Sequence, residues 1–547
     1  MLRLLISLVL WLGIASIGEG FEYFQTTDEL RQAIQSYAIY NLPDSPVAKK
    51  YGYPIGTWQV GNLEGRISCQ GLETLIPLRI SYIDVSLSEL YSPLDFSNLL
   101  FGSSFNEDLS QWDTSRATNM EGCFAGASSF NRNISSWSTA RVENFAQMFA
   151  DCTSFNQPVL FDTSSATNMA AMFSSASSFN QPLSSFDTSK VLYLESFLEN
   201  AKSFDQPLSF DASSCLTMRA MFRGASRFNQ PVSLANTYNL ADVSSMFSGA
   251  SSFDRDLSSL DVSGVVDASY MFYRANKFSG TGLEAWNTTK LQSMKSMFAS
   301  ETSPTYVEGS VFNGSIGDWD TSRVADLSWA FAGASSFNQD LHWDVSKVTT
   351  IEGLFYWATE FNGDLSTWQT SSLANMNSAF YSAKRFNQPV GHFDTSLVVD
   401  MNSAFATDYD SSPFNQDLSS WNTSSVTDMS AMFVGLTSFT GDLNSWDVSR
   451  VRDMSSMFLG SAFNGDLSAW NVGNVESMYQ MFLYSYDFDQ NLCEWGPRMN
   501  KSAKVASMFS SSKCPNKANP NLSTNPPGPL CYDCAATRSL RGSKSSV

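Results

Sequence analysis

The chain has 547 residues, of which 33 are Lys or Arg, 53 are Asp or Glu and 2 are His, giving a net charge of −20. This charge argues against a nucleic-acid partner, because phosphate binding requires clustered Lys and Arg side chains. Two histidines leave little basis for a zinc hydrolase or a histidine-based catalytic triad. A hydrophobic fraction of 43%, with 41 Phe, can form a large core and excludes a disordered chain.

The N-terminus has the features of an export signal. An apolar run from Leu4 to Ile17 follows Arg3, and its length of about 14 residues is too short for a membrane-spanning helix. We therefore expect a signal peptide over residues 1–18, with an uncleaved signal anchor as the alternative. No later stretch is apolar for long enough to span a membrane, so the mature chain is expected to be soluble, with no transmembrane segment, and secreted or held at the cell surface.

Residues 19–79 are expected to form an N-terminal cap. The sequence Thr26-Thr-Asp-Glu29 is a capping box, and the apolar spacing after it predicts a helix over residues 28–40. A degraded copy of the repeat described next lies at Ile55–Val60.

A short motif recurs through most of the chain. The Phe of a Ser-Phe-Asn element occurs sixteen times, and successive copies are 24 or 25 residues apart, except for intervals of 34 and 28 residues that contain inserts at 301–310 and 407–413. The marker residues are Phe105, Phe130, Phe155, Phe179, Phe204, Phe228, Phe253, Phe278, Phe312, Phe337, Phe361, Phe386, Phe414, Phe439, Phe463 and Phe488. A period of this length is typical of a stacked repeat protein.

The pattern inside one repeat predicts a strand followed by a helix. Leu418–Ser424 has the alternation of a short extended segment, and Val426, Met429, Met432 and Phe433 have the spacing of a two-turn helix. One such unit cannot bury its apolar face alone, so the units must stack. We therefore expect an α/β repeat solenoid of about 16 strand-plus-short-helix units over residues 80–509, with the repeated Phe, Met and Trp in its core.

An Asn or Asp follows most marker Phe residues. A short amide at a fixed turn position can bond the backbone of its own and the next repeat, so we expect a structural ladder. Its members are Asn106, Asn131, Asn156, Asn180, Asp205, Asn229, Asn313, Asn338, Asn362, Asn387, Asn415 and Asn464.

The stretch Phe414–Phe433 resembles the repeat of BspA-like surface proteins, a group that includes leucine-rich-repeat-like modules of mycoplasma surface lipoproteins and many secreted algal and diatom proteins. The resemblance extends over about Ile80 to Phe509. It implies a leucine-rich-repeat-like fold and a surface or secreted role in adhesion or recognition, and the family motif carries no catalytic residue. This chain lacks the lipidation Cys of the bacterial lipoproteins.

Four of the eight cysteines lie near the C-terminus, where residues 510–547 are rich in Cys and Pro and are expected to form a cap and tail. In an exported protein, Cys493, Cys514, Cys531 and Cys534 are expected to form two disulfides, and all three pairings remain open. A zinc site is the alternative, because Cys531 and Cys534 have ligand spacing.

The other cysteines are interpreted separately. Cys123 and Cys215 replace apolar residues of the repeat and are expected to be buried thiols. Cys152 lies near the end of a predicted helix, and Cys69 has no obvious partner.

Six sequons are candidate glycosylation sites if the host is a eukaryote. They are Asn133, Asn287, Asn313, Asn422, Asn500 and Asn521.

Carboxylates also recur at two positions of the repeat. One row follows the Trp position and contains Asp113, Asp162, Asp187, Asp211, Asp261, Asp320, Asp344, Asp394 and Asp447. The other lies three residues after the marker Phe and contains Asp108, Asp256, Asp340, Asp364, Asp417, Asp442 and Asp466. Such rows could collect calcium, although turn formation and solubility are the favoured interpretation, because no compact Asp-x-Asp-x-Asp loop is present.

The sequence favours a protein that is not an enzyme, with no catalytic, cofactor-binding or metal-binding residue assigned. His342 and His392 lie two repeats apart, too far for a shared proton transfer, and no nucleophile or phosphate-loop motif is present. The predicted function is recognition or adhesion of an extracellular glycan or protein through a regular face rich in Ser, Thr and Asn. A structural matrix protein that binds calcium is the alternative, and an ice-binding surface is a weaker third hypothesis. The two inserts are the predicted places to look for specificity.

Overall fold

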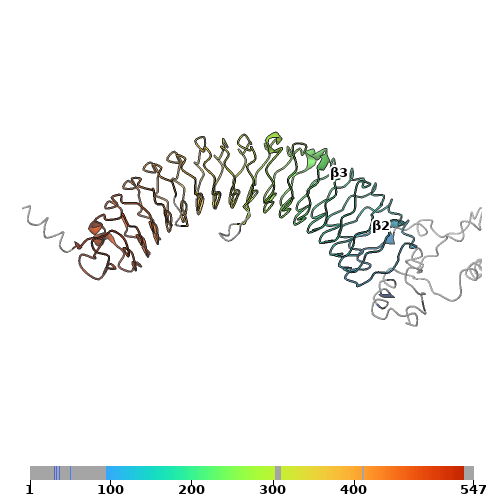
Figure 1. Cartoon of the computed structure of the whole chain (residues 1–547), viewed down its shortest axis with the longest axis horizontal. Helices are drawn as coiled ribbons and strands as arrows, with labels where there is room; N and C mark the ends of the chain where they lie inside the picture. Colours follow the sequence, from blue (N-terminus) through green and yellow to red (C-terminus); the bar gives the residue numbers. More distant parts are fainter. Residues whose placement is uncertain are drawn as a thin grey trace, which may run out of the picture. The chain divides into compact units, whose positions relative to one another are not determined.

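The computed structural model describes residues 94–301, 309–408 and 412–534, together with the separate positions Leu30, Gln32, Ala33, Ser36 and Lys50. The chain forms two compact units, residues 1–240 and 241–547. Within each unit the chain runs in successive circuits of about one repeat, here called coils, which lie side by side (Figure 1). The predicted signal peptide and most of the N-terminal cap lie outside the described residues, although Leu30 and Ala33 of the predicted cap helix are helical and buried.

The described part of the first unit contains two pairs of parallel strands and a short helix. Strand β1 (Leu94–Asp95) pairs with β2 (Ala117–Asn119), and β3 (Leu208–Asp211) pairs with β4 (Val232–Ala235). The 3-10 helix η2 (Thr237–Asn239) follows β4. Strands β2 and β3 are labelled in Figure 1.

Strands β3 and β4 form where two consecutive coils, at Leu208–Phe210 and Val232–Leu234, are each one residue short. Val159–Phe161 and Leu341–Trp343 are equally short, but each lies in a single such coil and forms no strand. In most coils, four residues from the Leu to the Trp or Phe position close a turn, as where the N–H of Phe186 donates to the carbonyl of Leu183 at 3.1 Å. Only one residue separates Leu208 from Phe210, so the turn cannot close. The segment is extended instead, with side chains alternating between core and surface as in an ordinary strand.

Elsewhere the coils are joined by single parallel β-bridges. In the first unit the bridges connect Asn119, Asn144, Asn168, Tyr193 and Thr217 in that order. In the second unit they connect Asp242, Asp267, Ser293, Asp326, Thr350, Asn375, Asp400, Asp428, Asp453, Ser477 and Lys504. We call these residues the bridge row. Each bridge joins one coil to the next, so equivalent side chains are about 4.8 Å apart.

The predicted repeat helices are wrong for the described coils. Within residues 429–435, every second N–H group donates to a carbonyl of the stretch 453–459 in the next coil, at N–O distances of 2.8 to 3.0 Å. The N–H groups of Met432 and Val434 close turns on carbonyls three residues earlier, at 3.3 and 3.2 Å. A two-turn helix is marginal by itself, whereas the neighbouring coil supplies partners for these backbone groups.

The turns of this segment require a left-handed backbone at fixed positions. Ala431 and Gly435 have φ angles of 57° and 71°, and each is the third residue of a turn, where a type II turn has positive φ. Residues with small or polar side chains recur at these positions in the other coils, for example Ser456 at φ 57°. The three-residue spacing of the apolar side chains therefore reflects successive turns and not a helix.

The second unit contains two further 3-10 helices, η3 (Leu283–Ala285) and η4 (Cys493–Arg498). In the described parts of the chain, no helix has the length and apolar character needed to cross a membrane.

The core is built from columns of stacked aromatic rings. The marker Phe130 stacks on Phe124 of the preceding turn segment with ring centroids 4.2 Å apart, and on Phe155 of the next coil at 5.9 Å. In the second unit, Trp446 stacks on Trp470 at 6.5 Å, and its indole N–H donates to the carbonyl of Leu418 at 3.0 Å. All sixteen marker Phe residues are buried, which confirms the prediction that the repeated aromatic residues are core.

Candidate recognition surface on the bridge segments

The repeated Thr of the Asp-Thr-Ser phrase is inside the protein and not on its surface. Thr423 is 1% exposed, and its hydroxyl donates to the carbonyl of Asp447 in the next coil at 3.0 Å. Val448 and Val472 occupy the same position in later coils and are equally buried. Since these Thr hydroxyls are used between coils, they form no exposed array, and this removes the main support for the ice-binding hypothesis.

The predicted Asn ladder is present. The side-chain carbonyl of Asn106 accepts the backbone N–H of Asn131 at 2.9 Å, and Asn131 accepts that of Asn156 at 3.0 Å. In the second unit, Asn338 accepts from Asn362 at 2.7 Å and Asn362 accepts from Asn387 at 2.8 Å. The ladder satisfies backbone donors between coils, so these amides have a structural role.

Both predicted carboxylate rows form local turns. Asp447, after the Trp, accepts the N–H of Ser449 at 2.9 Å, and Asp417, after the marker Phe, accepts that of Ser419 at 2.9 Å. Hydrogen bonds from these Ser residues lower the pKa values of both aspartates. Among the described residues, no three His, Cys, Asp or Glu side chains come together in a group that could hold a metal ion.

The two histidines contact different groups. Nδ1 of His342 lies 3.9 Å from a carboxylate oxygen of Asp318, and Nε2 of His392 lies 3.3 Å from the carbonyl of Leu365. These two contacts involve separate partners, and both histidines add to the hydrogen bonds from Ser366 in lowering the pKa of Asp364, which lies between their coils.

The four C-terminal cysteines are paired in the structure. Cys493 bonds to Cys534 and Cys514 to Cys531, which selects one of the three possible connectivities and leaves no thiolate of this set for zinc. The predicted burial of Cys123 and Cys215 is confirmed, and Cys152 is buried as well. Burial raises the pKa of both Cys152 and Cys215 to about 12, so these thiols stay protonated at neutral pH. Cys69 lies outside the described residues.

Five of the six sequon asparagines share one local geometry. In each of these, the side-chain carbonyl accepts the backbone N–H two residues later, at 2.9 to 3.2 Å. They are Asn133, Asn287, Asn422, Asn500 and Asn521. Asn313 instead belongs to the Asn ladder, where its side-chain carbonyl accepts the N–H of Asn338 at 2.9 Å.

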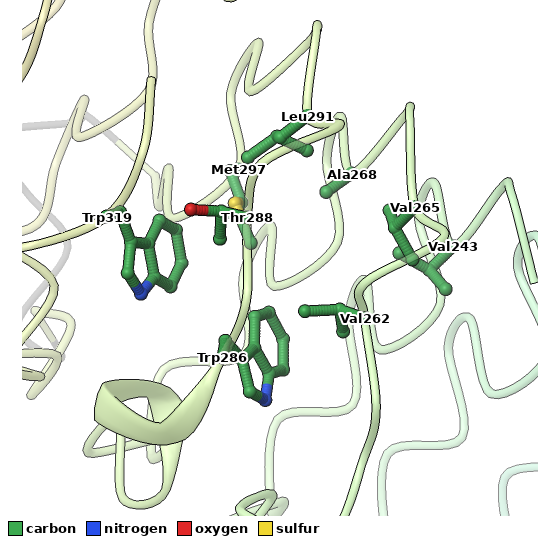
Figure 2. A pocket seen from close by; sticks show the side chains of 9 residues that line it. All are labelled: Val243, Val262, Val265, Ala268, Trp286, Thr288, Leu291, Met297 and Trp319. Carbon is green, nitrogen blue, oxygen red and sulfur yellow. The ribbon is translucent and has the colours of Figure 1, made fainter. Parts of the chain in front are cut away.

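A small apolar cavity of about 10 Å³ lies in the second unit, among the residues labelled in Figure 2. Trp286 and Trp319, whose rings stack 5.7 Å apart, line it together with Thr288. The Thr288 hydroxyl is buried without a hydrogen-bond partner. The cavity has too few polar groups for a bound water and is a packing defect.

The segments that carry the bridges have side chains that differ from coil to coil, such as Ser328, Glu352 and Asn377 at one equivalent position. A bridge segment is the bridge-row residue and the seven residues after it, such as 428–435, and we call the exposed side of these segments the bridge face. Its bridge-row aspartates form a third carboxylate row that sequence reasoning did not identify, and Asp400, Asp428 and Asp453 are consecutive members of it.

An aromatic cluster interrupts the small side chains of this face in three consecutive coils. It consists of Trp329, Tyr356 and Tyr381, all half-buried. The ring centroids of Trp329 and Tyr356 are 5.4 Å apart, and Tyr356 stacks on Tyr381 at 4.7 Å with an interplanar angle of 16°. Such ring pairs are favourable beyond their buried area, so the cluster fixes the orientation of its own side chains.

The indole of Trp329 packs against the backbone of the next coil. Trp329 replaces the small residue found at positions such as Ala431. Its backbone N–H makes the same bond to the next coil as in other repeats, donating to the backbone carbonyl of Glu352 at 2.8 Å. A side chain at Gly353 would collide with the six-membered ring of the indole. The absence of a side chain at Gly353, whose φ is 58°, therefore lets the indole lie across the backbone of that coil.

Carboxylate and amide groups adjoin the cluster on the same segments. The Asn375 amide donates to Glu352 at 3.3 Å, and the Asn377 amide donates to Asp400 at 3.2 Å. Tyr381 donates its hydroxyl to a carboxylate oxygen of Asp408 at 2.8 Å. These side chains are half-buried, and their hydrogen bonds hold them in defined positions next to the rings.

Sequence reasoning assigned the breaks in uniformity to the inserts alone and missed this cluster. The signal was present once the repeats are aligned: Trp329 occupies the position of Ala431, and Tyr356 and Tyr381 occupy that of Val434. Of the inserts themselves, residues 302–308 and 409–411 lie outside the described part.

Comparison with known proteins gives one family. The family described as "Mycoplasma protein of unknown function, DUF285" matches residues 94–160, 159–214, 208–306, 301–413 and 407–522. No curated protein matches the chain. The crystal structure of a TLR13–ssRNA13 complex is similar at 12% identity and covers 61% of this chain, with a TM-score of 0.15. The match spans 50% of that protein's chain, and at this TM-score it carries no argument.

Proposed function

The chain belongs to the DUF285 family, described as Mycoplasma protein of unknown function, and from that premise we propose that it is a secreted or cell-surface recognition or adhesion protein. In this proposal it binds an extracellular glycan or protein and catalyses no reaction. We further propose that its repeats are of the BspA-like, leucine-rich-repeat-like type, with one coil for each of the sixteen marker Phe residues.

One observation carries the proposal: the bridge face displays variable side chains on a scaffold whose repeated residues are used internally. The repeated Thr and Asn bond neighbouring coils, the Trp and Phe fill the core, and the aspartates close turns. Side chains that change from coil to coil, such as the exposed Tyr479, take no part in these repeated contacts. Rigid scaffolds with variable surface residues are suited to recognition.

The two C-terminal disulfides support an extracellular location. Disulfides form and persist in oxidising compartments and are rare in the cytosol. The signal peptide over residues 1–18 is part of the same proposal, and mass spectrometry of the exported chain tests it.

A structural, calcium-binding matrix role is the second candidate. The observation in its favour is the regularity of the aspartate rows, in which hydrogen bonds from the following Ser lower the pKa of members such as Asp417 and Asp447. A row of identical turns offers many equal weak sites and no selective one, so this role predicts binding without selectivity.

The two candidates are separated by the retention of labelled mature protein on intact cells and cell-wall polysaccharides, with and without a calcium chelator. Recognition predicts saturable and selective retention that survives chelation. Unselective retention that disappears on chelation would support the matrix role instead. Absence of retention on every surface would contradict the matrix role and leave recognition of a soluble protein partner as the remaining form of the proposal.

A further inference from the structure

The aromatic cluster and the polar groups beside it form a composite surface in the coils that contain Trp329, Tyr356 and Tyr381. We propose that this surface is a binding site for a neutral pyranose glycan, with a sugar ring packed on Trp329 and its hydroxyls bonded to Glu352 and Asn377. The proposal rests on the proposed function and deepens it by naming the site and the class of ligand.

The chemistry of the surface matches both the apolar C–H patches and the hydroxyl groups of a sugar ring. A pyranose has patches of C–H groups, which pack against an aromatic face, and a rim of hydroxyls that both donate and accept hydrogen bonds. Trp329 supplies a large, half-buried indole whose seat on Gly353 fixes its orientation. The carboxylate of Glu352 accepts hydrogen bonds, and the amide of Asn377 both donates and accepts them.

The polar groups are held in place before any ligand arrives. The Glu352 carboxylate receives the Asn375 amide at 3.3 Å, and the side-chain carbonyl of Asn377 accepts the hydroxyl of Ser378 at 2.8 Å. Ordering flexible side chains is one of the main costs of binding, and prior ordering reduces it. A weak, hydroxyl-rich ligand gains most from such a surface.

The spacing of the coils suits a polymer rather than a single sugar. Neighbouring coils are about 4.8 Å apart, which is close to the length of one pyranose residue in an extended chain. The polar residues Glu352, Asn377 and Asn402 occupy the same position in three consecutive coils. A glycan chain that runs along the stack could therefore meet an equivalent polar group at each successive sugar.

The charge of the surface selects among glycans. Asp326 and Asp400 belong to the bridge row of these coils, Glu352 lies between them, and Asp408 follows. The Lys384 ammonium lies over the ring of Trp357, 5.4 Å from its centroid. Carboxylates outnumber this cation, so uronate or sulfated chains would be repelled and a neutral glycan is preferred.

A protein partner fits the surface less well. Energetically central contacts in protein interfaces come from aromatic or Arg anchors that insert into fully desolvated pockets. Here Tyr356 and Tyr381 are stacked on one another and Trp329 already lies on the backbone of the next coil, so these three rings are engaged within the protein and are poorly placed to insert into a partner.

The test is calorimetric titration of the full mature chain with cellohexaose, laminarihexaose and an oligogalacturonate of equal length. We expect one neutral hexasaccharide to bind and the oligogalacturonate not to bind. Trp329→Ala and Glu352→Gln should each weaken that binding at least tenfold, and Trp329→Phe should weaken it less than Trp329→Ala. The matched control is Tyr270→Ala, because Tyr270 occupies the same coil position as Trp329, also has positive φ, and is 37% exposed outside the cluster.

Circular dichroism and thermal unfolding of each variant establish that it is folded. Equal affinity of wild type and Trp329→Ala would overturn the site while leaving glycan recognition in place. Selective retention on cells, without binding of any neutral hexasaccharide, would overturn this inference but leave the proposed function standing with a protein partner. Preference for the oligogalacturonate would overturn the assignment of a neutral ligand.

Discussion

The hydroxyl of Thr423 donates to the backbone carbonyl of Asp447 across 3.0 Å, and so joins two coils from inside the stack. The same arrangement occurs between Thr163 and Asp187 at 2.9 Å in the first unit. Where a coil carries Val instead, as at Val448, the side chain fills the same buried space without the bond. Thr and Val have nearly the same shape, and the coil therefore accepts either residue.

This relationship predicts that Thr423→Val costs little. The variant loses one hydrogen bond, worth about 1 kcal/mol, but keeps the packing that Val448 shows to be acceptable. Thr423→Ala loses the bond and also leaves a small cavity, so it should destabilise by more. Guanidinium unfolding of the two variants checks the order, and a greater loss for Val than for Ala would contradict it.

The Asn ladder predicts a cost at its interior positions. In Asn362→Ala, the half-buried N–H of Asn387 loses its acceptor at 2.8 Å, and the loss of such a hydrogen bond costs about 1 kcal/mol. Asn362→Asp is the matched control, since Asp205 holds the same rung by accepting from Asn229 at 3.0 Å. Thermal unfolding should show a clear loss for Ala and a smaller one for Asp. Equal losses would mean that the side-chain carbonyl is not the relevant group.

The aspartate turns predict loss of stability in acid. Eleven aspartates have lowered pKa values, each chiefly because the Ser two residues later donates hydrogen bonds to the carboxylate. A folded pKa below the unfolded value of about 3.9 gives stability that is complete above that value and is lost as pH falls through the folded pKa. The unfolding midpoint should therefore be steady at neutral pH and fall below about pH 4.

The control for this pH effect comes from coils that have Asn in place of the turn Asp. Asn422 and Asn471 form the same turn without a titratable group, accepting N–H bonds at 3.1 and 3.3 Å. A variant with Asp344, Asp394 and Asp447 all changed to Asn should keep its fold. Between about pH 5 and pH 3, the range around the unfolded Asp pKa of about 3.9, it should lose less stability than the wild type. An unchanged acid slope in this variant would show that the turns are not responsible.

The packing of the Trp329 indole on Gly353 predicts a specific effect of Gly353→Ala. The added methyl collides with the indole, so the ring must leave its position. Gly102→Ala is the control, because Gly102 also has positive φ, of 66°, with no atom near the new methyl. Both variants carry the same type of backbone strain, and only Gly353→Ala should alter the near-ultraviolet circular dichroism of the aromatic cluster.

The disulfides predict that the C-terminal segment can lose its structure while the preceding coils stay folded. Removing the Cys514–Cys531 bond by a double change to Ser should destabilise the segment it closes by about 2–4 kcal/mol. Because repeat stacks depend mainly on nearest neighbours, limited proteolysis should cut residues 515–534 first and leave earlier coils protected. Simultaneous loss of protection throughout the second unit would contradict this local role.

How much of this could be predicted from the sequence differs between core and surface. Burial of Phe130, Trp446 and Cys123 followed from the repeat, because identical apolar residues at a fixed period must share one environment. The path of the backbone did not follow. The same apolar spacing fits both a helix and successive turns, as at Val426, Met429, Met432 and Phe433. Spacing alone cannot show which backbone N–H groups will donate to carbonyls of the next coil.

The candidate site was missed for a related reason. Trp329, Tyr356 and Tyr381 are up to 52 residues apart in the sequence, and each looks like an isolated substitution in its own repeat. Stacking places them in consecutive coils, where rings meet at 5.4 and 4.7 Å. A careful alignment of the repeats could have identified the positions, although not the contacts between the rings.

By itself, the sequence determined the period, the apolar residues of the core, the Asn ladder and the net negative charge. These depend on composition and on repetition, which act in the same way in every coil. Only the tertiary structure decided that turns replace the predicted helices, that Thr423 is buried, and that Trp329 lies on Gly353. Each of these depends on which atoms the neighbouring coil presents, and that is fixed only when the coils stack.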